Sequence, residues 1–242
     1  MEGPSVHQAA KRTSHLAGQT IEEVYGNARQ PIEELVGKKI EKVRAVKKRL
    51  FIDTDGFSII THFLMYGSYR INERREKPER IGIRCTKDTL NIYNGSVKVL
   101  DPKSTEYMEY DQPERDVLSN AFDKEDALDA MRRDDRIIAD VLLDQDIFGG
   151  VGNIIKNEVL YLARIDPRSV SSSIPEGKAA ELIEVVIDYS RRWLQSKLTG
   201  NALTRVMYNQ QECECQKRVT RENMGEYNRR TFYCSSCQAL YQ

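Results

Sequence analysis

The feature that most constrains the fold is a change of sequence pattern near residue 100. Between residues 20 and 101 the sequence consists of short stretches rich in β-branched and aromatic residues, separated by Gly, Asp and Asn turns. Many short strands at this spacing predict a β-sandwich or a flattened barrel. Residues 102–123 contain Pro102, Pro113 and many acidic side chains, which is typical of a linker. After residue 123 the apolar residues recur at helical spacing, so we expect an α+β chain with two folding units.

Helices are expected at both ends of this β-rich region. The stretch that follows Pro4 has apolar residues at helical spacing and stops at Gly18, which predicts one amphipathic helix.

With 242 residues, of which 40 % are hydrophobic, the chain is long enough for two hydrophobic cores. We place a β-sandwich domain with its N-terminal helix at 1–112, a helical domain at 113–200 and a C-terminal segment at 201–242. Four helices are expected in the second half, over residues 124–133, 136–145, 153–165 and 176–198.

Composition narrows the environment of the protein. The chain has no apolar run of the roughly 18 to 20 residues that cross a bilayer, and its first residues lack the pattern of a signal peptide. We expect a soluble, cytoplasmic protein, nucleoid-associated in a bacterium or archaeon. A formal net charge of zero argues mildly against nucleic-acid binding. However, residues 1–80 have a basic excess and residues 101–146 an acidic one, so a basic binding face and two merely solvated surfaces both remain open.

Four of the five cysteines crowd the end of the chain. They are Cys213, Cys215, Cys234 and Cys237, whereas Cys85 lies alone in an alternating apolar stretch that predicts a buried core thiol. Without an export signal, such a cluster is more typical of a metal site than of disulfides. Four thiolates complete the tetrahedral shell of one structural zinc ion, and a hairpin this small needs the metal to stay folded. A hairpin without metal is the alternative.

A glycine-rich turn between two expected helices is the second candidate site. Gly149, Gly150 and Gly152 allow the backbone to approach a ligand closely. Asn153 follows at the start of a helix, where N–H groups and the helix dipole favour an anion such as phosphate. An ordinary helical hairpin with glycines for close packing is the alternative.

Residues 142–167, which contain this glycine turn, resemble the helix-two-turn-helix signature of the Fpg/Nei family of base-excision DNA glycosylases. In that signature LLDQ, the glycine turn, G-N-I and N-E-V-L-F/Y follow in this order. The resemblance extends over nearly the whole chain and favours the Nei-like branch. It implies an N-terminal helix plus β-sandwich at 1–112, a helix-two-turn-helix DNA-binding domain at 113–200 and a zinc finger with a β-hairpin at 201–242, with DNA in the cleft between the domains. By the same resemblance, Asn153 binds the phosphates that flank the lesion and Lys156 assists it.

Two further basic residues match the family. The sequence NRRTFYC resembles the family's zinc-finger motif R-x-T-F-x-C-x-x-C-Q, so Arg229 matches the arginine that contacts phosphate near the extruded nucleotide. Lys48, in VKKRLFID, matches the lysine that contacts phosphate at the lesion, with a solvated basic edge as the alternative.

The chain departs from the family's zinc-finger motif in the spacing of its first two cysteines. Only Glu214 separates the first two cysteines, where the family usually has two residues, and a C-x-C pair can still bind one zinc ion.

The stretch HFLMYG, residues 62–67, is the candidate for a wedge. An enzyme that extracts a base from the duplex must fill the gap, and a protruding apolar or aromatic side chain does this. Nei-type members resemble this stretch, which nominates Leu64, Met65 and Tyr66 as the wedge. A core strand is the alternative. We expect a structural role for His62, which has no metal-binding partner nearby.

The N-terminus both matches and departs from the family. Members begin Met-Pro-Glu-Gly-Pro: after methionine removal the proline amine attacks the sugar C1′ and the glutamate transfers protons. This chain begins Met1-Glu2-Gly3-Pro4, and the bulky Glu2 predicts that methionine, with a primary amine, is retained. Three hypotheses remain open. Met1 forms the Schiff base, Glu2 activates water for hydrolysis alone, or the protein binds lesions without chemistry.

The resemblance therefore implies a base-excision-repair DNA glycosylase, with lyase activity at abasic sites if an amine is the nucleophile. The short segment between Thr199 and Cys213 leaves little room for the loop with which 8-oxoguanine-type members cover their base, so we expect an oxidised pyrimidine as the lesion. The expected partner is double-stranded DNA with a damaged base or an abasic site, or single-stranded or branched DNA, bound by a monomer. The alternatives are a non-catalytic damaged-DNA or junction binder, and a zinc-ribbon protein-interaction module, which leaves Asn153 unexplained.

Overall fold

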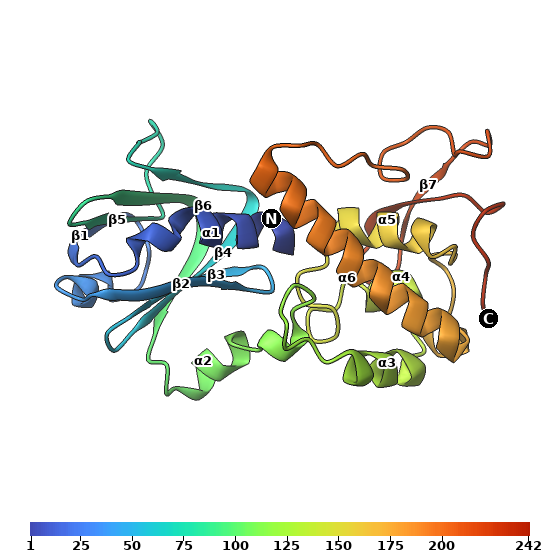
Figure 1. Ribbon diagram of the computed structural model, residues 1–242, viewed down its shortest axis with the longest axis horizontal. Helices are drawn as coiled ribbons and strands as arrows, with labels where there is room; N and C mark the ends of the chain where they lie inside the picture. The colour runs from blue at the N-terminus through green and yellow to red at the C-terminus, as the bar shows by residue number, and fades with distance from the viewer. The chain divides into compact units, whose positions relative to one another are not determined.

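The computed structural model describes residues 1–242 and divides into two compact units, Met1–Gln112 and Pro113–Gln242 (Figure 1). The stretch expected as a linker contains the short helix α2 (Thr105–Tyr110) and a 3₁₀ turn at Pro113–Arg115. None of the helices combines the length and the apolar composition that a membrane span requires.

The first unit consists of one helix and one curled sheet. Helix α1 (Gly3–Thr13) has Pro4 in its first turn, where the fixed φ of proline is suitable, and its buried side chains include Val6, Ala9 and Ala10. It packs against β2 and β3. Six antiparallel strands form the sheet, in the order β1-β5-β6-β4-β3-β2. Their bounds are β1 Ile21–Tyr25, β2 Ile40–Val46, β3 Arg49–Thr54, β4 Ser58–Ile71, β5 Ile81–Cys85 and β6 Thr89–Leu100.

The two edges of this sheet approach each other at one end. Thr20 and Lys39, which precede the edge strands β1 and β2, form an isolated antiparallel bridge. The Gly18 amide also donates to the carbonyl oxygen of Ile40, 2.7 Å away. The sheet therefore curls around an apolar core, as a flattened barrel does. Cys85 lies in this core and is 3 % exposed, as the sequence predicts.

Strands β4 and β6, of 14 and 12 residues, are longer than the short strands that the sequence predicts. Gly67 and Gly95, which are typical of turns between short strands, lie inside β4 and β6 and form no turn. Instead the β4–β6 register shifts between Phe63 and Ser68. A Cβ atom on Gly67 would lie 2.7 Å from the carbonyl oxygen of Asn94, so only glycine allows the two backbones to approach this closely. The result is a bulge rather than a hairpin.

The second unit is built on the 24-residue helix α6 (Glu176–Thr199), which Gly200 ends in the left-handed conformation. Helices α3 (Lys124–Arg133) and α5 (Asn153–Leu162) pack against it. Helix α4 (Ile138–Val141) is shorter than the predicted 136–145, because the Leu143 amide bonds to the Asp140 carbonyl only three residues back and the chain enters a turn. The other three expected helices are present.

A two-stranded hairpin, β7 (Thr220–Met224) and β8 (Arg229–Tyr233), completes this unit. Phe232 of β8 packs with Tyr161 of α5 and with Met207 in one apolar cluster. The buried Glu158 carboxylate of α5 accepts hydrogen bonds from the amides of residues 206, 207 and 208, at 2.6 to 2.9 Å. Helix α5 therefore holds both the hairpin and the chain that leads to it.

Candidate nucleic-acid interface

The N-terminal amine of Met1 lies at the start of the β4 bulge. It donates a hydrogen bond to the carbonyl oxygen of Phe63, 3.2 Å away. Glu2 is the N-cap residue of α1, and its carbonyl oxygen accepts from the amide of Ser5 at 2.9 Å. Burial lowers the pKa of the Met1 amine below its usual value of 8.0; the positive charge of Lys48 lowers it further, whereas Glu2 raises it. A larger fraction of this amine is therefore neutral near pH 7 than at an exposed terminus.

The surroundings of this amine are basic. Lys48 follows Lys47, which adopts a positive φ in the turn between β2 and β3. His62 pairs with Arg49 across β3 and β4. Burial lowers the pKa of His62, and the charges of Arg49, of the Met1 amine and of Lys48 add to this shift. His62 is not among the residues of the four-cysteine cluster, the one candidate metal site of the chain, so the structural role expected for it stays a prediction.

The three candidate wedge residues are all exposed, which a regular strand does not allow. Leu64 is 45 %, Met65 70 % and Tyr66 88 % exposed. Tyr66 has a φ of 64°, a left-handed conformation that is uncommon for a bulky residue. The Asn94 side chain holds the bulge, donating from Nδ2 to the Met65 carbonyl oxygen at 2.5 Å. Strain of this kind persists where the surrounding structure enforces it, often at ligand-binding sites.

A cavity of about 370 Å³ adjoins Met1, and sequence reasoning missed its lining. Gln8 and Arg12 come from α1, and Tyr69 and Arg70 from the part of β4 beyond the bulge. Burial raises the pKa of the Tyr69 hydroxyl, although the positive charge of Arg12 acts in the opposite direction. In the sequence these residues occupy ordinary helix and strand positions, so no motif marks them.

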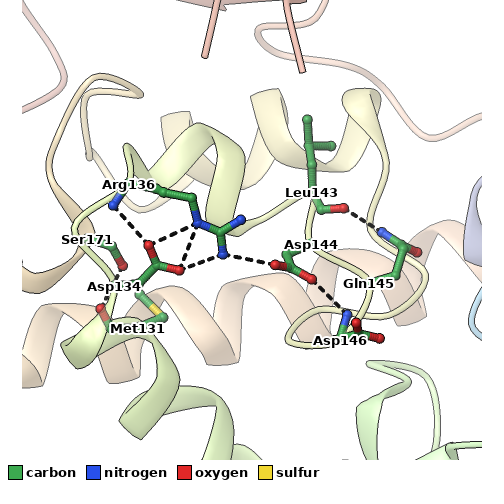
Figure 2. Close-up of polar contacts among 8 residues, drawn as sticks. All are labelled: Met131, Asp134, Arg136, Leu143, Asp144, Gln145, Asp146 and Ser171. Atoms are coloured by element: carbon green, nitrogen blue, oxygen red, sulfur yellow. Dashed lines mark hydrogen bonds and ion pairs between the residues drawn. The ribbon is translucent and has the colours of Figure 1, made fainter. Parts of the chain in front are cut away.

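In the second unit, polar side chains hold the glycine turn and the segment before it, of which Figure 2 shows Asp144, Gln145 and Asp146. Gln145 donates from Nε2 to the carbonyl oxygens of Leu143 and Val151, at 2.8 and 3.1 Å, and accepts from the amide of Gly150, which has a φ of 95°. Figure 2 shows Arg136 between the carboxylates of Asp134 and Asp144, at 2.6 and 2.9 Å. These bonds fix the backbone that leads into α5.

Asn153 is the first residue of α5 and also contacts the hairpin. Its Nδ2 donates to the carbonyl oxygen of Arg230 at 2.9 Å, while its buried Oδ1 has no hydrogen-bond partner. One turn later, the Asn157 Oδ1 accepts from the amide of Phe232 at 2.6 Å. Arg229 and Arg230 are exposed on β8, and neither forms an ion pair. The N-terminus of α5 and these two cations therefore belong to one locally connected surface.

Lys156 occupies a different position from the one we expected for a residue that assists Asn153 in phosphate binding. Its side chain is 1 % exposed, and Nζ donates to the Thr231 hydroxyl at 2.7 Å. A phosphate in solution does not reach an ammonium group buried in this way. The position favours a structural role, in which Lys156 joins α5 to β8.

The four cysteine side chains come together as a metal site requires. Their sulfur atoms all lie within 4.8 Å of one another, with Cys213 and Cys237 at 3.7 Å and Cys215 and Cys234 at 3.6 Å. Ligands at about 2.3 Å from zinc in a tetrahedron are separated by about 3.8 Å, so the cluster fits one structural zinc ion. The single-residue spacing at Glu214 does not prevent this.

The neighbours of Cys213 favour its thiolate form. Burial opposes ionisation, but hydrogen bonds from the Cys215 backbone, from Tyr161 and from neighbouring thiols lower the pKa of Cys213 to about 7. The Tyr161 hydroxyl lies 3.3 Å from the Cys213 sulfur and 3.1 Å from a carboxylate oxygen of Glu214. Helix α5 thus contacts the metal site directly.

Asp140 is another residue that sequence reasoning missed. It lies in α4, is 2 % exposed, and accepts a hydrogen bond from the Glu226 amide at 2.7 Å in the turn between β7 and β8. Gly225 precedes it with a φ of 73°, and any side chain there would collide with the carboxylate. No sequence signal distinguishes such an aspartate from a solvated one, because its partner is 86 residues away.

Comparisons with known proteins agree with this geometry. The formamidopyrimidine-DNA glycosylase N-terminal domain matches residues 1–107, and the formamidopyrimidine-DNA glycosylase H2TH domain matches residues 114–202. Endonuclease 8-like 3 of Xenopus laevis is 27 % identical over 245 residues, which is 96 % of this chain and 40 % of that protein. Endonuclease 8-like 2 of Mus musculus is 35 % identical over 130 residues, 52 % of this chain and 39 % of that one.

The chain thus spans well under half the length of these curated relatives. Among solved structures, a viral DNA glycosylase superimposes with a TM-score of 0.87 at 22 % identity, over 99 % of this chain and 100 % of that one. Formamidopyrimidine DNA glycosylase of Lactococcus lactis, bound non-covalently to DNA containing an abasic site, has a TM-score of 0.85 at 22 % identity, over 98 % and 99 % of the two chains. These likenesses show the fold.

Proposed function

Because the chain belongs to the Fpg/Nei family of DNA glycosylases, within which the relatives are Nei-like, we propose that it excises a damaged base from DNA with the Met1 amine as nucleophile. The observation that carries this proposal is the position of the amine. The amine donates a hydrogen bond to the Phe63 carbonyl oxygen beside the exposed wedge, and burial and the charge of Lys48 lower its pKa. A lowered pKa leaves more of this amine neutral, and a neutral amine can act as a nucleophile. Its position beside the wedge places it where a displaced nucleotide would lie.

The proposed reaction begins with extrusion of the damaged nucleotide and insertion of the wedge residues into the gap. The amine lone pair attacks the sugar C1′, and the glycosidic bond breaks with its electron pair going to the base, which takes up a proton. Glu2, adjacent to the amine, is the proposed proton carrier. The amine bound to C1′ becomes a Schiff base when the sugar ring opens, and loss of the 3′ phosphate by β-elimination then cuts the strand. Lys48 is proposed to contact a phosphate at this step.

The second unit supplies the proposed grip on the backbone. Asn153, at the positive end of α5, and the exposed Arg229 are proposed to bind phosphates next to the lesion. One zinc ion, held by the four cysteines, would keep the hairpin folded and Arg229 in place. The proposed partner is duplex DNA with a damaged base or an abasic site, bound by a monomer, with single-stranded DNA as a further substrate.

For the lesion, we propose an oxidised pyrimidine. The relatives are named Endonuclease 8-like, and the cavity beside Met1 is lined by Gln8 and Arg12, residue types that can form hydrogen bonds with the edge of a base. A lesion panel tests this proposal, and 8-oxoguanine paired with cytosine as the best substrate would contradict it.

Borohydride trapping tests the nucleophile. The protein, with its first residue verified by intact mass, is incubated with an abasic-site duplex and reductant, and the covalent adduct is mapped by peptide mass spectrometry. We expect one adduct, on the Met1 amine. A matched sample whose terminus carries one additional residue should form none, because the new amine no longer lies at Phe63.

The outcomes separate the open hypotheses. Base release without an adduct would replace the covalent mechanism with hydrolysis by water that Glu2 activates. Glu2→Gln should then abolish excision, and excision at the wild-type rate would exclude Glu2 as the proton carrier. Lesion binding with neither an adduct nor base release would instead support a non-catalytic binder, the candidate favoured by the replacement of the family's N-terminal proline.

A further inference from the structure

A second cavity of the first unit lies on the β4–β6 bulge, and we infer that it binds a phosphodiester of the DNA strand next to the gap that Tyr66 fills. The cavity has a volume of about 650 Å³. This inference rests on the proposed function, and it adds a strand-binding site that is separate from Asn153 and Arg229. Its lining combines the wedge residues Leu64 and Tyr66, part of β6, Asn27 after β1, and the segment between β4 and β5, which supplies Arg75, Lys77 and Arg80.

The charge of this cavity is of one sign. Arg75, Lys77 and Arg80 line it, and no aspartate or glutamate does. None of the three forms an ion pair within the protein. Unneutralised cations that surround one hollow raise the local concentration of anions. Since a folded protein normally disperses or pairs such charges, the cluster favours an anionic ligand.

A neighbouring cavity of similar size provides an internal comparison. It is lined by Arg74 and Arg84, but Glu23 and Glu79 line it as well. In that cavity Arg74 Nε forms an ion pair with a carboxylate oxygen of Glu79 at 2.8 Å, and Arg84 Nε forms one with a carboxylate oxygen of Glu23 at 2.9 Å. The arginines of that cavity are already satisfied by carboxylates. The difference therefore depends on the absence of acidic partners rather than on the number of basic residues.

Two of the cations are held in position by polar and aromatic groups. Arg80 donates from one terminal nitrogen to the backbone and side-chain oxygens of Asn27, at 2.9 and 3.2 Å. The guanidinium of Arg75 lies 5.6 Å from the centre of the Tyr93 ring, and the Arg75 amide donates to the Tyr93 hydroxyl at 2.9 Å. A side chain that is already ordered loses less entropy when it binds a phosphate.

The same cavity includes the surface on which a base would stack. Tyr66, 88 % exposed and held by the bulge, lines the cavity together with Leu64. An aromatic platform beside a cationic groove is the arrangement with which proteins bind single strands: bases stack on the ring while phosphates follow the charge. A base in contact with Tyr66 has its own phosphate next to it along the strand. This continuity favours a DNA strand over a free anion as the occupant.

The test compares two double variants. Arg75→Gln with Lys77→Gln removes two charges from the cavity, whereas Arg84→Gln with Lys87→Gln removes two from the same unit outside it. Binding to a duplex with an abasic-site analogue is measured by fluorescence anisotropy at several salt concentrations. Each phosphate contact contributes about 0.9 to the slope of log K against log salt. We expect the cavity variant to lose about 1 to 2 units of slope and to bind about tenfold more weakly at low salt, and the control variant to keep the wild-type slope.

A wild-type slope in the cavity variant, with a native circular dichroism spectrum and zinc content, would overturn the inference while leaving the glycosylase proposal intact. Failure of the unmodified protein to prefer lesion DNA over intact duplex would overturn the proposed function itself. A third arm adds inorganic phosphate or deoxynucleoside monophosphate as competitor. If either displaces the duplex from wild type and not from the cavity variant, at an ionic strength matched with chloride, the site binds small anions and the strand assignment is wrong.

Discussion

The amine of Met1 and the carbonyl oxygen of Phe63 lie 3.2 Å apart, at the point where β4 passes from a buried residue to the exposed Leu64. One hydrogen bond thus connects the proposed nucleophile to the base of the proposed wedge. Any change in the bulge should therefore affect the chemistry as well as DNA binding.

The pH dependence of adduct formation follows from this position. Only the neutral amine attacks C1′, so the trapping rate should rise with pH through the pKa of the amine. Burial and the charge of Lys48 lower that pKa from 8.0, so the midpoint should lie below pH 8. Lys48→Gln removes one of the two lowering effects and should shift the midpoint upward. Single-turnover rates between pH 5.5 and 9 measure this, and a downward shift would contradict it.

Tyr66→Gly separates fold stability from DNA binding. The left-handed φ of 64° is unfavourable for tyrosine and acceptable for glycine, so the free energy of unfolding should stay equal or rise by about 1 kcal/mol. Affinity for the abasic duplex should fall about five- to 150-fold, because stacking on an aromatic ring contributes about 1–3 kcal/mol. Thermal melts and anisotropy titrations measure the two effects. A variant that is less stable and binds DNA normally would show that Tyr66 serves the fold alone.

Arg229→Gln should reduce the salt slope of duplex binding by about one, and Arg221→Gln is its matched control. Both arginines are exposed in the hairpin, but Arg221 lies on β7 and Arg229 on β8. Equal slopes for the two variants would mean that the hairpin acts by general charge rather than by a contact of Arg229.

Lys156→Met should lower stability and not the salt slope. The variant loses the hydrogen bond from Nζ to Thr231, and its hydroxyl is left without that donor. Hydrogen bonds of charged groups contribute about 1.5–3 kcal/mol, so the second unit should unfold at lower denaturant concentration. If stability is unchanged and the slope falls by about one, Lys156 reaches the DNA after all.

Zinc retention should depend on Tyr161. Its hydroxyl lies 3.3 Å from the sulfur of Cys213, and groups that hydrogen-bond metal ligands commonly change metal affinity about 10- to 100-fold. Tyr161→Phe keeps the packing of the ring and should accelerate zinc transfer to a colorimetric chelator. Tyr208→Phe, whose ring packs on Phe232, is a control for loss of a hydroxyl in the same region. Identical transfer rates for the two variants would exclude this role.

Much of the architecture could be predicted from local patterns. The helices at 124–133 and 176–198, the curled β unit and the four-cysteine cluster all depend on spacing within one segment, and the structure confirms them. The prediction of short strands separated by glycine turns was wrong at Gly67 and Gly95, because a sequence pattern alone makes glycine look like a turn residue. Here it permits close approach of two strands instead, and only the partner strand reveals that.

The sequence by itself determined which groups are available: a glycine turn before Asn153, four thiols with metal spacing and a basic first unit. The tertiary structure alone decided which charges are exposed and which are satisfied. It buried Lys156 against Thr231, used Asp140 to hold the hairpin turn, and left Arg75, Lys77 and Arg80 without acidic partners. The reason is physical. A charge acts on a ligand only if no internal group has neutralised it, and its internal partners come from distant parts of the chain.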